Sequence, residues 1–293
     1  MTKTIRTAYE EISNFIHYLK VMQYDFEVRT TTNSTIIKFQ DIYSSKKMIF
    51  NSGGYMSHKE MRLQREIKKE VEENTKGQII KYNGQKIAYN QFSDTIEYMI
   101  ETTGEYIKLE NIYEMDITKA YYKIALNLGY ISQAFYDKCL NLPKDIRLRL
   151  IGSIATKKVI EIYKKGEQVS IKVVQNERLR QIWFHICYEV GKIMSECSES
   201  IHDYFVFYWV DGIYFQKRVG MNIESDPSRQ IIQNIFENNN LEFTITKLDY
   251  ITLQNYDTYI NLECYKDKQK KSNFSVPKTK VRKYYYNNKE LVI

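Results

Sequence analysis

The stretch that decides the fold is Tyr204-Phe205-Val206-Phe207-Tyr208-Trp209-Val210-Asp211-Gly212-Ile213-Tyr214-Phe215-Gln216-Lys217-Arg218. Two runs of β-branched and aromatic residues flank Asp211-Gly212, and an Asp-Gly pair in that setting is the strongest short-range signal of a β-hairpin. The runs are almost wholly apolar, so we expect both strands to be buried. Asp211-Gly212 would then form the type I′ turn between them.

The segments around this hairpin alternate between strand-like and helical patterns. The expected elements, in chain order, are a strand over 112–117, a helix over 118–128, a long helix over 144–165 that Gly166 ends, a strand over 168–174, a helix over 176–197, a helix over 227–238, and strands over 241–253 and 258–265. This order predicts an α+β fold in which helices pack on one face of an antiparallel sheet.

The first 110 residues read as a separate α+β module. Helices are expected over 5–22, 58–74 and 91–102, strands over 24–30 and 34–40, and a hairpin over 78–90 about Asn83-Gly84. The helix over 58–74 is highly charged, and its only apolar stripe is Leu63, Ile67 and Val71. We therefore expect that helix to be mostly solvated.

Composition excludes several classes of protein. The 293 residues are 43% hydrophobic, which is enough to form a core and rules out wholesale disorder. No run approaches the roughly 18 apolar residues of a membrane span, and the first residues lack the apolar stretch of a signal peptide. The cysteines, Cys139, Cys187, Cys197 and Cys264, are too scattered for a zinc ribbon or a disulfide scaffold. They indicate a reducing compartment, so a cytoplasmic location is expected, in the host cell if the protein is viral.

Positive charge is concentrated in the C-terminal segment. The whole chain carries +7, whereas residues 266–289 hold nine basic residues and one acidic residue, a net charge of +8. Tyrosines interrupt this segment, and basic residues with interleaved rings are typical of contact with nucleic-acid phosphates and bases. A solvated tail is the alternative interpretation. The candidate contact residues are Lys278, Lys280, Arg282, Lys283 and Tyr285.

Two aspartates stand at the ends of apolar strands. Asp116 ends the strand over 112–117 and could simply cap the following helix, while Asp211 could simply make the hairpin turn. Carboxylates at two strand ends can also meet side by side on one sheet. Paired carboxylates bind Mg²⁺, and two such ions can stabilise the attacking and leaving oxygens of phosphoryl transfer.

The residues around both aspartates resemble the palm motifs of family B DNA polymerases. The stretch from Asp116 to Ile124 is similar to D-x-x-S-L-Y-P-S-I, with Asp116, Tyr121 and Ile124 matching. Trp209-Val210-Asp211-Gly212-Ile213 resembles the third motif, D-T-D-S-I, with Asp211 as its second aspartate and Trp209 in place of its first. The residues from Tyr208 to Asp211 fit the Y-x-D-D of reverse transcriptases about as well. The resemblance implies that Asp116 and Asp211 are the metal ligands.

A third similarity concerns the fingers motif K-x-x-x-N-x-x-Y-G. Arg149 takes the lysine position, which places Ser153 at the asparagine and Thr156 at the tyrosine. Spacings of four and three would keep these residues on one helical face. Arg147 and Lys157 are neighbouring candidates for phosphate contact, so the resemblance makes this helix the nucleotide-binding element.

Two further assignments follow from the resemblance. Tyr121 takes the position of the tyrosine under the incoming sugar, which implies a preference for deoxynucleotides, although a plain helix residue would simply be core. Lys283-Tyr284-Tyr285 resembles the K-x-Y motif that holds primer strands. The first 110 residues are too short for the usual proofreading exonuclease, so the resemblance is to a minimal polymerase of phage or mobile-element type.

The sequence thus predicts a DNA polymerase-like nucleotidyltransferase with an N-terminal module over 1–110. A palm-like domain would span 111–265, with a small helical fingers-like insertion at about 130–175, and a basic, thumb-like tail would span 266–293. The expected cofactor is a pair of Mg²⁺ ions, with Mn²⁺ as the alternative. The expected partners are a DNA primer–template, dNTPs and other replication proteins, with no membrane. A non-catalytic palm-like nucleic-acid-binding or replication-accessory protein and a structural, virion-associated protein are the alternatives.

Overall fold

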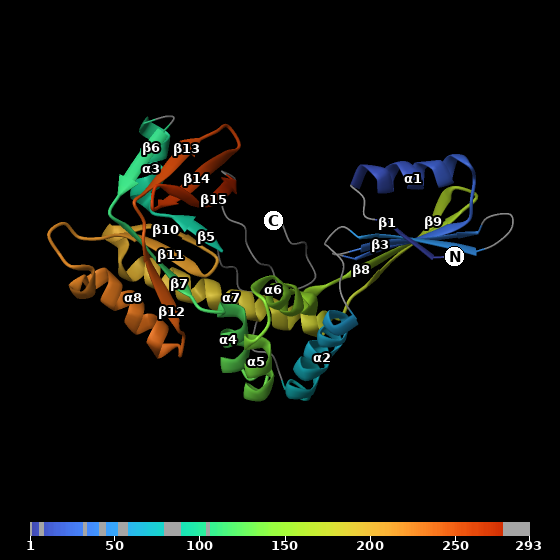
Figure 1. Cartoon of the computed structure of the whole chain (residues 1–293), viewed down its shortest axis with the longest axis horizontal. Coiled ribbons are helices and arrows are strands. Elements are labelled where there is room, and N and C mark those ends of the chain that lie inside the picture. The colour runs from blue at the N-terminus through green and yellow to red at the C-terminus, as the bar shows by residue number, and fades with distance from the viewer. Residues whose placement is uncertain are drawn as a thin grey trace. The chain divides into compact units, whose positions relative to one another are not determined.

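The computed structural model divides the chain into two compact units (Figure 1), which we call unit 1 and unit 2. It describes residues 2–5, 9–31, 34–40, 45–51, 58–78, 89–103 and 106–277. Unit 1 comprises Met1–Gln78 and Asp137–Trp183, and unit 2 comprises Ile79–Tyr136 and Phe184–Ile293. The division differs from the expected boundary near residue 110, because each unit is assembled from two separate segments of the chain.

Unit 1 is built on a six-stranded sheet in the order β1-β4-β3-β2-β8-β9. Its strands are β1 (Thr2–Ile5), β2 (Phe26–Thr31), β3 (Ser34–Gln40), β4 (Ser45–Asn51), β8 (Lys158–Lys164) and β9 (Glu167–Val174). Neighbouring strands are antiparallel except for β1 and β4, which are parallel. Helix α1 (Tyr9–Val21) lies over one face of the sheet (Figure 1).

The core of unit 1 lies between α1 and this sheet. Alternation along β2 turns Phe26 and Val28 toward α1, where both are almost fully buried. Leu19 of α1 is also buried, and the ring of Phe26 stacks on Tyr163 of β8 with centroids 4.3 Å apart. The helix expected over 5–22 therefore forms as α1, and its apolar face covers the sheet.

The prediction of a long helix over 144–165 is wrong. Helix α6 (Lys144–Gly152) ends early, a short 3₁₀ turn follows at Ser153–Ala155, and β8 begins at Lys158. Lys165 and Gly166 both have positive φ angles, 48° and 79°, which is the backbone of a type I′ hairpin turn rather than of a helix end. A Cβ on Gly166 would lie 2.3 Å from the carbonyl oxygen of Lys20, so only glycine fits there.

The charged helix α2 (His58–Asn74) has the expected bounds but is less solvated than expected. Its apolar stripe of Leu63, Ile67 and Val71 is buried, and Ile67 and Val71 have no exposed surface. The helix packs against α6 and the 3₁₀ turn that follows it. One narrow stripe is therefore enough to fix a helix whose remaining surface is charged.

Unit 2 is built on a five-stranded antiparallel sheet in the order β12-β7-β11-β10-β5. Its strands are β5 (Asn90–Phe92), β7 (Ile112–Ile117), β10 (Phe205–Trp209), β11 (Gly212–Gln216) and β12 (Phe243–Lys247). Helices follow β7, the hairpin β10–β11 comes next, and α8 (Pro227–Asn238) leads to β12. This is the β-α-β-β-α-β arrangement, with β7 between the edge strand β12 and the middle strand β11.

Both faces of the five-stranded sheet are covered. On one face lie α8 and the C-terminal part of α7 (Glu177–Ser200). Tyr208 of β10 is buried on this face, and its burial, together with the charge of Glu199 on α7, raises its pKa. On the other face lie α3 (Asp94–Thr103) and a second sheet (Figure 1), in the order β15-β14-β13-β6. The α+β class is confirmed. Helices cover one face as expected, but the other face is covered as well, by α3 and a second sheet.

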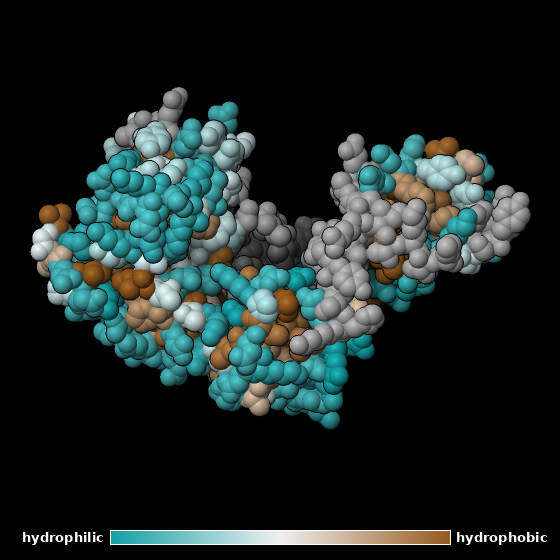
Figure 2. Space-filling model, in the orientation of Figure 1, coloured by the Kyte–Doolittle hydropathy of each residue, from teal (hydrophilic) through white to brown (hydrophobic). Residues whose placement is uncertain are grey.

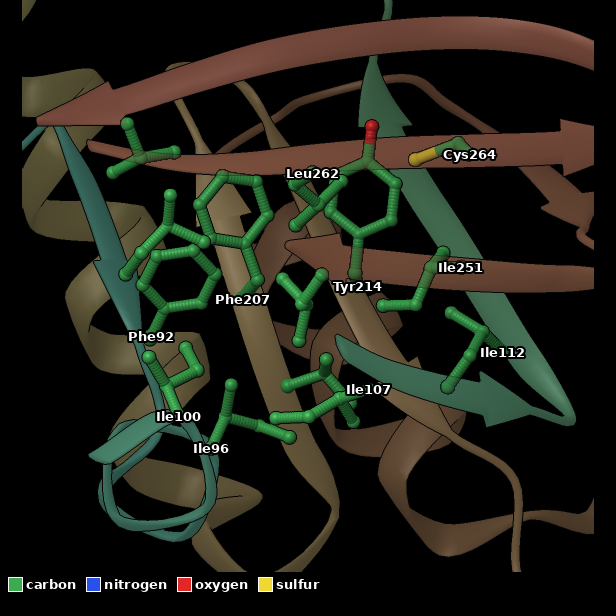
Figure 3. Packing of buried hydrophobic residues seen from close by; sticks show 14 of the residues in the cluster. Phe92, Ile96, Ile100, Ile107, Ile112, Phe207, Tyr214, Ile251, Leu262 and Cys264 are labelled. Carbon is green, nitrogen blue, oxygen red and sulfur yellow. The ribbon is translucent and has the colours of Figure 1, made fainter. Parts of the chain in front are cut away.

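The second sheet of unit 2 includes part of the segment expected to be a basic tail. Its strands are β6 (Tyr106–Glu110), β13 (Tyr250–Asn255), β14 (Tyr259–Lys266) and β15 (Gln269–Pro277). Phe207, Tyr214 and Leu262 are among the side chains that fill the space between the two sheets (Figure 3). The outward side of this sheet is mostly hydrophilic (Figure 2). Residues 266–277 are thus the turn and second strand of the β14–β15 hairpin, and the alternation along β15 buries Val276 in that core.

Three other observations complete the fold. The hairpin expected about Asn83-Gly84 lies outside the described residues. In the part of the chain that is described, no helix is long and apolar enough to cross a membrane. The four cysteines are all buried free thiols.

Candidate functional site

Strand β7 carries two carboxylates on one face. Alternation along Ile112–Ile117 puts Glu114 and Asp116 on the side of the second sheet, and Met115 and Ile117 on the helix side. Met115 and Ile117 are almost fully buried, which fixes the register of the strand. Asp116 is only partly buried, at the end of a central strand. A carboxylate is therefore presented at the edge of an otherwise apolar layer.

The β10–β11 hairpin forms as expected, but its turn is shifted by one residue. Trp209 pairs with Gly212, so the two loop residues are Val210 and Asp211. Val210 has a φ of 57°, which is rare for a β-branched residue. Its amide donates to the carbonyl oxygen of Tyr89 at 2.7 Å, and the carbonyl of Asp211 accepts from Ile117 N at 2.9 Å. The neighbouring segments therefore hold this turn in place.

The structure brings the two expected metal ligands to the same end of the sheet. Asp116 lies directly across the ladder from Gly212, and Asp211 is the next residue along the hairpin. A Cβ on Gly212 would lie 3.2 Å from Asp116 Oδ1 and 3.9 Å from Glu114 Oε1. The missing side chain at Gly212 leaves the space that these carboxylates use.

Trp209 occupies the same row of the sheet as Asp116, one strand beyond Gly212. Its ring packs against Phe274 of β15 and Tyr89, with centroids 5.2 and 5.3 Å apart. An apolar ring thus stands where the polymerase motif has its first aspartate. Asn90 is the next residue in the row; it is 9% exposed, and its Nδ2 has no hydrogen-bond partner among the described residues.

Glu114 is the functional candidate that sequence reasoning missed. It is 9% exposed, accepts a hydrogen bond from Tyr214 Oη at 2.7 Å, and forms an ion pair with Lys271 of β15. The signal was present, because Glu114 and Asp116 are spaced by two in a strand and so share a face. Lys271 was counted only as part of the basic tail.

The polar cluster around Glu114 perturbs its neighbours. Burial first, and then the charge of Glu114, raises the pKa of Tyr214 well above its ordinary value, with Asp116 adding to the effect. Burial also raises the pKa of Cys264 to about 11, and the charge of Glu114 contributes. Tyr214 and Cys264 are therefore protonated at neutral pH, so the hydroxyl of Tyr214 can donate to Glu114.

The donor set suits Mg²⁺ if a ligand completes the coordination. Among the described residues, no group of three or more His, Cys, Asp or Glu side chains is arranged to hold a metal ion. Mg²⁺ is commonly held by one or two carboxylates together with substrate phosphates and water. Asp116 and Asp211 provide carboxylates of that kind, and the ion pair with Lys271 leaves Glu114 less available as a ligand.

Tyr121 lies at the second position of α4 (Ala120–Asn127), five residues after Asp116. The chain turns into this helix at Lys119, whose φ of 59° is left-handed. Tyr121 is half-buried, whereas Tyr122 is 3% exposed and belongs to the core. The expected sugar-contacting tyrosine is therefore the more accessible of the two.

Four of the five expected nucleotide-binding residues lie in unit 1, whereas the fifth, Tyr121, lies in unit 2 with Asp116 and Asp211. Arg147 donates to the carbonyl oxygen of Leu142 at 2.6 Å, and Arg149 pairs with Glu60 and Asp145, both at 2.9 Å. The pair with Glu60 joins α6 to α2, whereas the other two contacts are local to α6 and the turn before it.

Ser153 and Lys157 follow α6 rather than continuing it. Ser153 is 2% exposed in the 3₁₀ turn, and Lys157 is exposed before β8. Thr156, the third member of the expected fingers stripe, has an extended backbone and donates to the carbonyl oxygen of Ser153 at 2.7 Å. The single helical face expected to carry Arg149, Ser153 and Thr156 is therefore wrong, because the helix ends at Gly152.

The expected nucleic-acid contacts of the tail, Lys278, Lys280, Arg282, Lys283 and Tyr285, lie outside the described residues. No protein-family model matches the chain. No curated protein sequence matches it either. The case for any function therefore rests on the residues and contacts of the chain itself.

Proposed function

We propose that the chain is a palm-type nucleotidyltransferase that adds deoxynucleotides to a primer 3′-hydroxyl on DNA. The observation that carries this proposal is the placement of Asp116 and Asp211 at one end of the sheet. Asp116 pairs with Gly212 across β7 and β11, and Asp211 precedes Gly212 in the hairpin turn. A sheet with helices on one face and two aspartates at its end is what the resemblance to polymerase palms implies.

Each residue has a role in this proposal. Asp116 and Asp211 would hold Mg²⁺, which when bound lowers the pKa of the primer hydroxyl and neutralises the triphosphate. Tyr121, in the helix that follows Asp116, would contact the sugar of the incoming nucleotide and exclude a 2′-hydroxyl. Lys271 holds Glu114 and so limits the repulsion that a third carboxylate would add beside Asp116.

Primer extension with Mg²⁺ and dNTPs tests the proposal. The wild-type chain is compared with Asp116→Ala and Asp211→Asn, and we expect each substitution to reduce extension by about 100-fold or more. Asp203→Asn is the matched control, because Asp203 is a highly exposed aspartate of the same unit. Extension that survives either site substitution would sink the two-aspartate assignment.

The choice of sugar is tested in the same assay. NTPs replace dNTPs, and we expect extension with NTPs to be much slower, because the ring of Tyr121 leaves no room for a 2′-hydroxyl. Tyr121→Ala should narrow the difference between the two sugars. Equal use of both sugars by the wild type would refute the role of Tyr121.

A second candidate is a non-catalytic palm-like protein that binds nucleic acid or replication partners. Trp209 favours it, because its ring packs on Phe274 in the place of a motif carboxylate, and the ion pair of Glu114 with Lys271 favours it as well. This candidate predicts that Asp116→Ala leaves every function intact. Nucleic-acid binding with no extension under any metal would support it over the enzyme.

A further inference from the structure

The second face of the unit 1 sheet is the feature that the proposed function does not use. Helix α1 covers the face that carries Phe26 and Val28. We call the opposite face of this sheet the open face. It is formed by the residues that alternate with Phe26 and Val28 in β2 and by their register partners in β3, β4, β8 and β9. None of its described side chains is buried. A broad sheet surface therefore remains accessible.

The open face is strongly basic. Its basic residues are Arg29, Lys38, Lys47, Lys158, Lys164 and Lys172, and its acidic residues are Glu27 and Glu167. Lys38 and Lys47 pair across β3 and β4, whereas Lys158, Lys164 and Lys172 lie on β8 and β9. Positive charge thus extends across five strands rather than along one edge.

The charges act on one another at the centre of the face. Arg29 pairs with Glu27 and lowers the pKa of that carboxyl, and Lys38 and Lys158 lower it further. Glu27 is therefore held as an anion by Arg29. None of the five lysines forms an ion pair with another residue in the part of the chain that the structure describes, so their charge is available to a ligand.

The uncharged part of the open face consists of aliphatic and small polar side chains. Ile36, Ile160 and Ile162 lie between the lysines, and the rings of these strands, such as Phe39 and Tyr163, are turned toward α1. Single-stranded nucleic acids are held largely by stacking of bases on rings. A face with lysines and without rings is suited to phosphates instead.

We propose that the open face binds the phosphate backbone of duplex nucleic acid without reading its sequence. The observation that carries the proposal is charge complementarity across several strands, joined to the absence of aromatic side chains among the described residues of that face. The proposal concerns a different surface from Asp116 and Asp211, and it holds whether or not the chain polymerises.

Fluorescence anisotropy with a labelled DNA duplex of mixed sequence, measured on the full chain over a series of salt concentrations, tests the proposal. Lys38→Gln/Lys172→Gln removes two exposed charges from opposite sides of the face. We expect the affinity to fall about tenfold, and the slope of log K against log salt to fall by about 1.8, for two lost phosphate contacts. A second duplex of unrelated sequence should give the same values.

Lys69→Gln/Lys76→Gln is the matched control, because both lysines are exposed on unit 1 but lie at α2 and the turn after it. It should bind duplex like the wild type. Equal loss in both double variants, or no loss in the open-face variant, would overturn the proposal. So would tighter binding of single-stranded DNA than of duplex, or binding of anionic phosphatidylserine vesicles without binding of duplex.

Discussion

Gly212 is the residue on which the geometry of the candidate site depends. Its backbone pairs with Asp116, and the space above it is shared by the carboxylates of Asp116 and Glu114. Because Asp211 adjoins Gly212 in the hairpin, any side chain at this position affects both proposed metal ligands.

Gly212→Ala is expected to lower primer extension about tenfold with little loss of stability. The new Cβ would lie 3.2 Å from Asp116 Oδ1, so the carboxylate has to move by a few tenths of an ångström, and small displacements of reacting groups are costly. The φ of Gly212 lies outside the left-handed region, so the backbone is not strained. Ile213→Val, on the opposite face, is the control and should retain activity. Full activity of Gly212→Ala would show that Asp116 does not act from this position.

Lys271→Met is expected to lower the free energy of unfolding by about 1–2 kcal/mol, because it leaves Glu114 buried without its cation. The double variant Glu114→Gln/Lys271→Met should lose less than the sum of the single changes. Lys270→Met is the control, since the neighbouring lysine makes an exposed pair with Glu263 that contributes about 0–1 kcal/mol. Denaturant unfolding measures the free energy of unfolding of Lys271→Met, Glu114→Gln, their double variant and Lys270→Met. Additive losses would show that the pair contributes no coupling energy.

Sequence reasoning identified candidate site residues only where a local sequence pattern distinguishes them. Asp116 and Asp211 stand at the ends of apolar runs, and motif spacing singled them out. Lys271 could not be found in that way, because its partner Glu114 is 157 residues away and only the packing of two sheets brings them together. The left-handed φ of Val210 was also hidden, since a valine gives no local signal for that conformation.

At the scale of elements, prediction succeeded where periodicity and end signals agreed. The helices α2 and α8 have the expected bounds, and α8 has an N-cap in Asp226, whose carboxylate accepts from Ser228 N at 2.8 Å. The prediction of a helix over 144–165 failed because its second half is a strand that pairs with β2 and β9, and because Lys165 and Gly166 make a hairpin turn. Gly166 was therefore a turn residue and not a helix end.

Tyr163 of β8, which packs on β2, makes the free energy of unfolding depend on pH in the alkaline range. Burial, followed by the hydrogen bond to Glu161, raises the pKa of Tyr163 to about 12. Because this folded-state pKa is above the ordinary value, the contribution is fully present below pH ~10 and is lost as the pH rises toward ~12. Compared with Tyr163→Phe, the wild type should lose about 2–3 kcal/mol of unfolding free energy over that window. Denaturant titrations at pH 9 to 12 measure the difference, and a constant difference would contradict the assignment.

At the scale of the whole molecule, two separate cores stabilise the chain. The core of unit 1 lies between α1 and its sheet, and the core of unit 2 lies between its two sheets. The sequence indicated an α+β chain with more than one part, but it placed the boundary near residue 110. Two of the three points where the chain passes between the units fall inside continuous helices, α5 (Gln133–Leu140) and α7, which carry no local mark of a domain end.

Thermal unfolding is therefore expected to show two transitions by calorimetry. Leu19→Ala creates a cavity in the first core and Leu262→Ala in the second, and each loss is expected to be about 2–5 kcal/mol because both side chains have no exposed surface. Each variant should lower one transition and leave the other in place. A single transition that both variants lower equally would show that the two cores unfold together.

The order in which the chain is synthesised delays the contact between Lys271 and Glu114. A ribosome makes β7 long before β15, since the two residues are 157 positions apart. During that interval Glu114 has no Lys271, and the core between the two sheets lacks Val276. Non-local pairings of this kind form late and expose apolar surface in the meantime. The nascent chain therefore has to be protected from aggregation until its last described strand has left the ribosome, and only then can the candidate site reach its final geometry.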